Sequence, residues 1–338
     1  MLDWFLQKVA SKLEFENLAV AGLLLATALG SALYVYWTTT RERSWREFFE
    51  FLWPHEIMTH PSAKADFWFW ITRRIAYPFL MIPAGAVFVA GMGYLTNQAL
   101  GGLFGISEPL LGAPGPVLIV LFTVTMLLAY DLSYYLYHYA QHKIPFLWEL
   151  HKVHHSAEVM VGITKDRVHP LDDMMNRVWD GVIPGIAFGI WTLLSLDPVE
   201  ATIFGLNVYV MRNILMMDFV RHTHLKISFG KLNDVVLCPH WHQLHHSADP
   251  KHYDKNFGLL FSFWDRWFGT LAVPAKDESF QFGLVERDRD EYQSLFGLWV
   301  LPLIRMAQHI PGLRRLIAPG PHRKTAGTLA TTPESSAS

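Results

Sequence analysis

Cysteine and charge are both scarce in this sequence of 338 residues. The single cysteine, Cys238, excludes a disulfide framework, a CxxC redox pair and a cysteine-rich zinc site. Charged residues make up 17% of the chain, whereas an average soluble domain carries roughly 25%, so too little charge is present to cover a water-facing surface. A formal net charge of −2 gives no electrostatic reason to expect nucleic-acid binding. The positive mean hydropathy, +0.19, excludes a disordered chain.

Long runs without charge indicate membrane segments. In chain order the runs are Asn17–Trp37, Ile75–Thr96, Pro116–Tyr130, Gly181–Leu196 and Ala201–Met211. The first is long enough to cross roughly 30 Å of hydrocarbon as a helix, and we interpret it as a retained anchor. Pro78 and Pro83 favour a kink or a broken hairpin in the second run. The third becomes mixed in polarity up to His142, and the last two resemble the arms of a helical hairpin.

Lysine and arginine in the short loops predict the orientation of these segments. The loop Thr38–Arg74 holds six such residues, whereas the loop Asn97–Gly115 and the link Ser195–Glu200 hold none. This asymmetry places the N-terminus outside and the segments after the third run on the cytoplasmic side. We therefore expect an all-α, multi-pass integral membrane protein of about four transmembrane helices or helical hairpins. A bacterial inner membrane is favoured over the endoplasmic reticulum, because neither a fused cytochrome domain nor a lysine-rich C-terminal retrieval signal is visible.

Histidine is concentrated in one part of the chain: there are 17, and 12 of them fall between His138 and His246. Ten of these twelve form an HxxxH box, two HxxHH boxes and a His-Thr-His triplet, and residues three or four apart share a helix face. A lone helical histidine is usually an ordinary surface or core residue, but this repetition is not coincidental. The candidate metal ligands are His138, His142, His151, His154, His155, His222, His242, His245 and His246.

Imidazole is the commonest side-chain ligand for iron, zinc and copper. Nine imidazoles exceed what one ion binds, so the sequence predicts two metal ions in a cytoplasmic, histidine-rich helical cap. An all-nitrogen ligand set with open positions favours redox-active iron that binds oxygen, and the lack of cysteine argues against structural zinc. His224 and His169 remain candidates for a tenth ligand.

With these boxes the chain resembles the fatty acid hydroxylase / sterol desaturase superfamily over about residues 115 to 272. The likeness includes the stretches Asp131–Tyr135, Asn256–Gly258 and Trp264–Thr270, together with Trp148, Ser156 and Pro239. The resemblance implies a non-haem di-iron centre in a helical membrane protein that uses O2 to attack a lipid C–H bond. The position of His222 matches a further ligand of that family.

We expect a monooxygenase that hydroxylates a fatty acyl, sterol or polar-lipid substrate, with desaturation by the same two iron ions as the alternative. A zinc-dependent membrane hydrolase and a non-enzymatic metal-binding protein are remoter readings. No haem, flavin or nicotinamide fingerprint is visible. Electrons are therefore expected from a separate cytochrome b5-, ferredoxin- or reductase-type protein docking on the cytoplasmic face.

Asp131 is the candidate catalytic side chain outside the histidines. It precedes His138 by seven residues, which places it within about 20° of the same helix face. We expect its carboxylate to accept a hydrogen bond from a ligand imidazole and to fix the tautomer; a nearby arginine or tyrosine is the alternative partner. Asp172, Asp173 and Asp218 are weaker candidates for the same role.

The chain divides into four expected parts. Residues 1–115 form N-terminal membrane helices, and residues 116–272 form the catalytic domain. Residues 273–318 form an interfacial amphipathic segment. Residues 319–338, which are rich in proline, threonine, serine and alanine, form a disordered tail.

Overall fold

A computed structural model describes residues 22, 25–40, 43–80, 84–112, 115–195, 202–203, 206–207, 218–275, 278–285 and 289–313. Regular structure in these residues is helical apart from one antiparallel pair of two-residue strands, β1 (Thr202–Ile203) and β2 (Leu206–Asn207). The expected helical fold is thus confirmed over these ranges. The predicted helix Ala201–Met211 is wrong where it is described, because its β-branched residues Thr202 and Ile203 favour an extended backbone.

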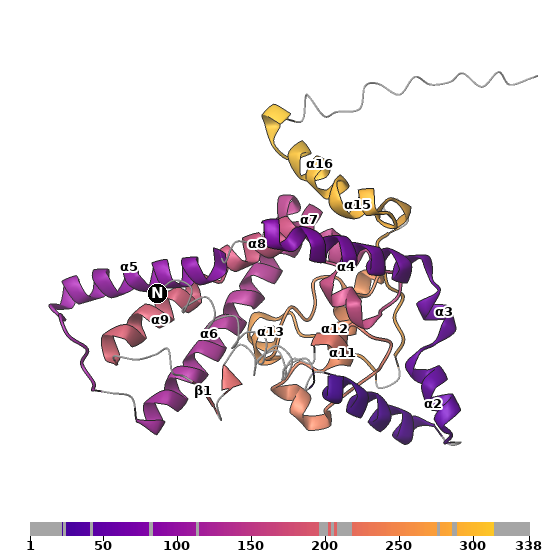
Figure 1. Cartoon of the computed structure of the whole chain (residues 1–338), viewed down its shortest axis with the longest axis horizontal. Coiled ribbons are helices and arrows are strands. Elements are labelled where there is room, and N and C mark those ends of the chain that lie inside the picture. Colours follow the sequence, from indigo (N-terminus) through magenta and orange to yellow (C-terminus); the bar gives the residue numbers. More distant parts are fainter. Residues whose placement is uncertain are drawn as a thin grey trace, which may run out of the picture.

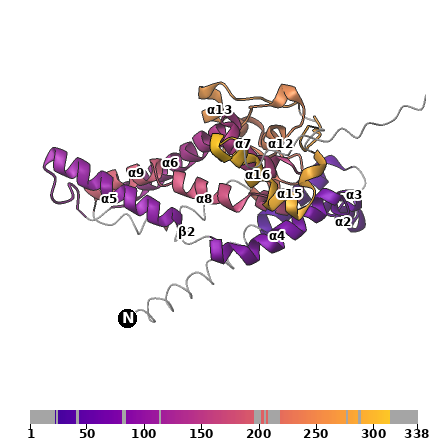
Figure 2. The ribbon, with the colours of Figure 1, turned by 90° about the horizontal axis from the view of Figure 1, so that it is seen from above.

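The helices form two regions, an elongated arm and a compact cap (Figures 1 and 2). The arm contains α5 (Ala84–Phe104), α9 (Ile183–Leu194) and the first half of α6 (Pro116–Lys143). The cap contains α4 (Pro61–Leu80), α7 (Pro145–His155), η1 (Gly162–Asp166), α8 (Pro170–Trp179), α11 (Asp218–Arg221), η3 (Gly230–Asp234), α12 (Pro239–His245), η4 (Pro250–His252) and α13 (Phe263–Phe268). Beside them lie α2 (Trp45–Leu52), α3 (His55–Met58), η5 (Asp290–Tyr292), α15 (Leu295–Trp299) and α16 (Leu301–Gln308).

Small residues allow the backbones of α5 and α9 to approach closely in the arm. A Cβ added at Gly189 of α9 would lie 2.4 Å from the carbonyl oxygen of Gly93 in α5. Asn97 donates a hydrogen bond across the same interface to Thr192, at 2.9 Å. Such close, glycine-lined contacts with an occasional polar bridge are typical of helix pairs in membranes.

Within the described ranges, α6 is the one helix that is long and apolar enough to cross a membrane. It begins with Pro116, whose fixed φ suits the first helical turn. Its first half exposes Val117, Val120 and Leu121, and only 39% of its most apolar window is buried. Its second half enters the cap. The third predicted run is therefore confirmed as one continuous helix that ends at the histidine box.

The other predicted runs fall on shorter or partly described elements. The second run is divided between α4 and α5, and residues 81–83 between them lie outside the described residues. Of the first run, residue 22 and residues 25–37 are described and helical. This helix packs Ala32, Val35 and Tyr36 against α2 and residues 220–227.

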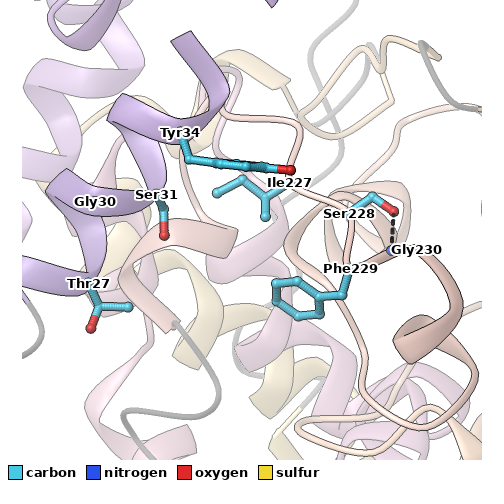
Figure 3. A pocket seen from close by; sticks show the side chains of 8 residues that line it. All are labelled: Thr27, Gly30, Ser31, Tyr34, Ile227, Ser228, Phe229 and Gly230. Atoms are coloured by element: carbon cyan, nitrogen blue, oxygen red, sulfur yellow. Dashed lines mark hydrogen bonds between the residues drawn. The ribbon is translucent and has the colours of Figure 1, made fainter. Parts of the chain in front are cut away.

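A groove of about 910 Å³ lies between this first helix and the turn at residues 227–230 (Figure 3). Its lining residues are Thr27, Gly30, Ser31, Tyr34, Ile227, Ser228, Phe229 and Gly230. Apolar atoms and four hydroxyl groups share the wall.

Arg167 ties the cap together. Its side chain is fully buried and donates to Asp66 of α4 at 2.7 Å, to Ser156 after α7 at 2.8 Å and to the carbonyl oxygen of Tyr292 at 2.9 Å. Its Nε also donates to the carbonyl oxygen of Val153, inside the second histidine box. Arg167 therefore connects α4, the segment after α7 and the backbone at Tyr292.

The segment expected to be interfacial packs on the cap through α15. Tyr292 and Leu298 are completely buried against Phe69 and Val153. One face of this segment is therefore covered by protein, while Phe296 on α15 is 60% exposed. The expected tail, residues 319–338, lies outside the described residues.

Candidate metal centre

Four helices bring the histidine boxes to one place in the cap. The HxxxH box ends α6, and the two HxxHH boxes lie on α7 and at the end of α12, while His222 directly follows α11. Both α7 and α12 begin with a proline, Pro145 and Pro239, which starts the helix at a defined residue just before its box. Eight of the nine predicted ligands are buried, and the side chain of His142 is 9% exposed.

The nine imidazoles form two groups, and all nine predicted ligands fall in them. The five-histidine group consists of His138, His142, His151, His155 and His245. The four-histidine group consists of His154, His222, His242 and His246. In each group the nitrogen atoms lie within 4.8 Å of one another.

Each HxxHH box contributes to both groups, in a regular way. Its first and last histidines, four residues apart, lie about 40° apart around the helix and enter one group. Its middle histidine, three residues from the first, enters the other group. On α7 the middle residue is His154, and on α12 it is His245. Helix α7 therefore contributes two histidines to the five-histidine group and one to the four-histidine group, and α12 contributes one and two.

In the four-histidine group, the Nε2 atoms are in contact. His154 and His222 are 3.2 Å apart, and His242 lies 3.1 Å from both His222 and His246. A neutral imidazole nitrogen either donates one hydrogen or accepts with one lone pair. Nε2 of His222 and Nε2 of His242 each take part in two of these contacts, so hydrogen bonds cannot account for all three. A cation at the common centre does, because ligands at right angles about 2.1 Å from a metal lie about 3.0 Å apart.

The tautomers in the five-histidine group also indicate a cation site. Nδ1 of His138 lies 2.9 Å from the carbonyl oxygen of Phe257, and Nδ1 of His245 lies 2.7 Å from that of Lys255. A carbonyl only accepts, so each Nδ1 carries the hydrogen and each Nε2 presents a lone pair. Nε2 of His245 is buried and has no hydrogen-bond partner among the described residues, nor do those of His142 and His155. Converging, unsatisfied lone pairs fit a bound cation.

Burial keeps these imidazoles neutral. It lowers the pKa of His245 to about 3, and it holds the pKa values of His154, His155, His242 and His246 well below their usual value. Neighbouring imidazoles add to the effect. Neutral nitrogen donors suit iron, zinc or copper, whereas magnesium and calcium prefer oxygen. The residues therefore fit two transition-metal ions.

A strained loop supplies the two carbonyl groups. Asp254 and Asn256 have positive φ angles, 59° and 57°, a region in which asparagine and aspartate are enriched. The Asn256 side chain donates to the carbonyl oxygens of Trp241 and Ala272 and accepts from the amide of Ala272, all at 2.8 Å. This fixes the loop so that the carbonyls on either side of Asn256 meet the histidines.

The structure gives Asp131 a different role from the one expected. Its buried carboxylate accepts hydrogen bonds from the amides of Leu260 and Phe261, at 2.8 and 3.0 Å, and from the indole of Trp264 at 2.9 Å. The loop places its amides over the carboxylate, while His138 pairs with a carbonyl of the same loop. Asp131 therefore supports the loop that orients the ligand.

Among the weaker candidates, Asp172 contacts a ligand. Its Oδ2 lies 3.5 Å from Nδ1 of His151. Asp173 instead pairs with Arg73 at 2.9 Å, and the side chain of Asp218 lies outside the described residues. Sequence spacing could not separate Asp172 from Asp173, because only the packing of α8 on α6 and α7 decides which one faces the histidines.

The candidates for a tenth ligand lie elsewhere. Nε2 of His224 is 2.8 Å from the carbonyl oxygen of Phe51. His169 caps α8 by accepting from the amide of Leu171, and its Nε2 donates to the carbonyl oxygen of Trp299 at 3.0 Å. Neither belongs to the groups found within the described ranges.

A cavity of about 370 Å³ reaches the five-histidine group. Its lining residues are His142, Trp148, Lys152, His155, His245, Ser247, Tyr253, Asp254, Gly283, Leu284 and Val285. The indole of Trp148 packs on two of these ligands, with ring centroids 5.0 Å from His142 and 5.4 Å from His155. No sequence signal assigned residues 283–285 to the site.

Comparison with known proteins points to one family. Residues 123–270 match the family described as fatty acid hydroxylase. The chain is 30% identical over 172 residues to an alkylglycerol monooxygenase from Caenorhabditis elegans, covering 50% of this chain and 31% of that protein. It is 28% identical over 177 residues to human cholesterol 25-hydroxylase, covering 48% of this chain and 57% of that protein.

The family match lies in the histidine-rich part, and the chain spans only part of the length of its relatives. The chain covers 31% of the worm protein and 57% of the human one, and no solved structure matches it. The matched segment nevertheless contains all nine histidines of the two groups. The match to the fatty acid hydroxylase family therefore covers the segment that holds both histidine groups.

Proposed function

We propose that this chain is a membrane di-iron monooxygenase that hydroxylates an unactivated C–H bond of a lipid. The observation that carries the proposal is the convergence of nine buried imidazoles in two groups. The balanced reaction takes RH, O2, two electrons and two protons to ROH and water. The site has no flavin or haem motif beside it, so the two electrons come from a separate donor protein.

The histidines would hold the two iron ions, which supply oxygen activation when bound. The protein orients the ligands through the Phe257 and Lys255 carbonyls and keeps the imidazoles neutral by burial. Low exposure of the groups also keeps bulk water from the reacting carbon. The cavity that reaches three imidazoles of the five-histidine group gives O2 and the substrate access.

The bilayer is the source of the substrate in this proposal. The arm exposes large apolar side chains on α5, α6 and α9, including Val87, Leu103, Val124 and Ile190. Such surfaces suit lipid contact. The loop charges favour a multi-pass protein with the N-terminus outside and the histidines on the cytoplasmic side. The groove beside the first helix, which carries both apolar and hydroxyl groups, suits a lipid with a polar end (Figure 3).

The substrate class follows from the relatives. Their names specify an alkylglycerol and cholesterol, so an ether lipid or a sterol is the first probe. The donor is of the cytochrome b5, ferredoxin or reductase type and docks on the cytoplasmic side.

One experiment tests the proposal and its rivals. The purified protein, freed of metal and reloaded with iron or zinc, is given a reductant, ¹⁸O2 and an alkylglycerol or cholesterol. We expect about two irons per chain and a product alcohol carrying one ¹⁸O with iron only. An unlabelled alkene would identify a desaturase, and an oxygen-independent product with zinc would identify a hydrolase. Fewer than two metal sites per chain would overturn the di-iron assignment.

A further inference from the structure

The outer nitrogens of the two histidine groups have different surroundings. In the five-histidine group, Nδ1 of His138 and Nδ1 of His245 are held by backbone carbonyls, and Nδ1 of His151 faces Asp172. In the four-histidine group, the buried Nδ1 atoms of His242 and His246 have no hydrogen-bond partner among the described residues. Two acidic side chains, Asp172 and Asp254, contact histidines of the five-histidine group.

Asp172 is fixed in place by the helix that carries the first histidine box. It is 2% exposed, and its Oδ1 accepts from the hydroxyl of Tyr137 at 3.0 Å and from Nε2 of Gln141 at 2.6 Å. Both donors lie on α6. Its second oxygen, Oδ2, is thereby directed to His151 at 3.5 Å. A carboxylate held in this way acts on the metal through the imidazole.

We propose that the two sites bind metal unequally and that Asp172 is the positioning residue that makes the five-histidine site the tighter one. The proposal rests on the proposed function, in which both groups hold an ion. A negative carboxylate beside the outer nitrogen of a ligand imidazole raises the basicity of the inner nitrogen, and partners at this position typically change metal affinity by 10- to 100-fold. The extra imidazole of this group acts in the same direction.

The neighbouring residue provides a matched control. Asp173 has the same chemistry on the same helix, but it pairs with Arg73 and Arg177. Asp172→Asn keeps an oxygen that can accept from Tyr137 and Gln141 while removing the negative charge, so the packing of α8 on α6 is preserved. Asp173→Asn removes the same charge one residue away.

Cobalt binding to the metal-free, detergent-purified chain tests the proposal without turnover. The double variant His242→Ala/His246→Ala leaves the five-histidine group as the intact site, and His142→Ala/His245→Ala leaves the four-histidine group. We expect two Co²⁺ per wild-type chain with affinities at least about tenfold apart, the five-histidine background showing the tighter one. Asp172→Asn is expected to weaken binding about 10- to 100-fold in that background and to leave the other unchanged. Asp173→Asn changes neither.

The outcomes separate this proposal from the one it rests on. Equal affinities of the two double variants would overturn the inequality, and equal weakening of both by Asp172→Asn would overturn the role of Asp172. In either case two bound ions would still support the di-iron function. Failure of the wild-type chain to bind two ions would overturn the function itself. The comparison of the two double variants needs no change at Asp172, so the inequality is testable even if Asp172→Asn does not fold.

Discussion

The arm and the cap of this molecule are built on opposite principles. In the arm, α5 and α9 meet through glycines and the Asn97–Thr192 hydrogen bond, and they expose apolar side chains. In the cap, buried charges and imidazoles are held by dense hydrogen bonds, with Arg167 and Asp131 each making several. The arm suits a lipid solvent and the cap a metal centre. The difference shows that association of the arm depends on shape, whereas the cap depends on hydrogen bonds and ion pairs between buried polar groups.

The largest expected effect comes from removing single ligands in the cap. His154 and His155 are neighbours on α7 but belong to different groups. We expect His154→Ala and His155→Ala each to reduce two bound irons per chain to about one and to abolish turnover, because each removes a nitrogen donor. Elemental analysis and product formation measure this. His224→Ala, outside both groups, is the control and should retain both ions; loss of an ion there would make His224 a ligand.

The next effect concerns the buried ion pair that supports the cap. Arg167→Met leaves Asp66 buried and unpaired, which typically costs about 3–5 kcal/mol. Because Arg167 also holds the carbonyl of Val153, both histidine groups should lose metal together. Thermal unfolding in detergent measures the cost. Arg266→Met breaks an exposed pair with Asp234 and should change stability by less than about 1 kcal/mol. Equal effects of the two variants would contradict the central role of Arg167.

A change in the arm should affect stability and leave the metal centre intact. Gly189→Leu places a side chain where the backbone of Gly93 lies 2.4 Å from the added Cβ, and such overpacking costs typically about 1–3 kcal/mol. Gly91→Leu on α5 meets nothing within 4 Å and is the matched control. Unfolding midpoints and iron content together measure the outcome. Loss of iron in Gly189→Leu would show that arm and cap are coupled.

The smallest expected change in stability, counted for each titrating histidine, is a pH dependence that arises in the cap. Burial lowers the pKa of the five histidines His154, His155, His242, His245 and His246. The unfolded chain therefore binds more protons than the folded one below the ordinary histidine pKa of about 6.5. Stability of the metal-free protein should be constant above this pH and fall below it, by up to about 1.4 kcal/mol per pH unit for each histidine. Denaturation at several pH values measures the slope. A flat profile would contradict the burial of neutral imidazoles.

Contacts within one helix were predictable from the sequence, whereas contacts between Asp131 and a distant loop were not. Spacing correctly put His138 and His142 on one face of α6, because a helix has a fixed rotation per residue. The same reasoning put Asp131 beside His138, yet its carboxylate accepts from the backbone amides of Leu260 and Phe261. Which backbone amides reach a buried carboxylate depends on a loop 129 residues away in the chain, and no local pattern encodes that contact.

The sequence by itself determined the candidate ligands: three boxes and His222 supply nine imidazoles, and the apolar runs indicate membrane contact. Only the tertiary structure decided how those imidazoles divide into five and four, with each HxxHH box split between the groups. It also decided that Asp172, and not Asp173, faces a ligand. The physical reason is that covalent spacing sets neighbours within one helix, whereas the packing of α6, α7, α8 and α12 sets neighbours between helices.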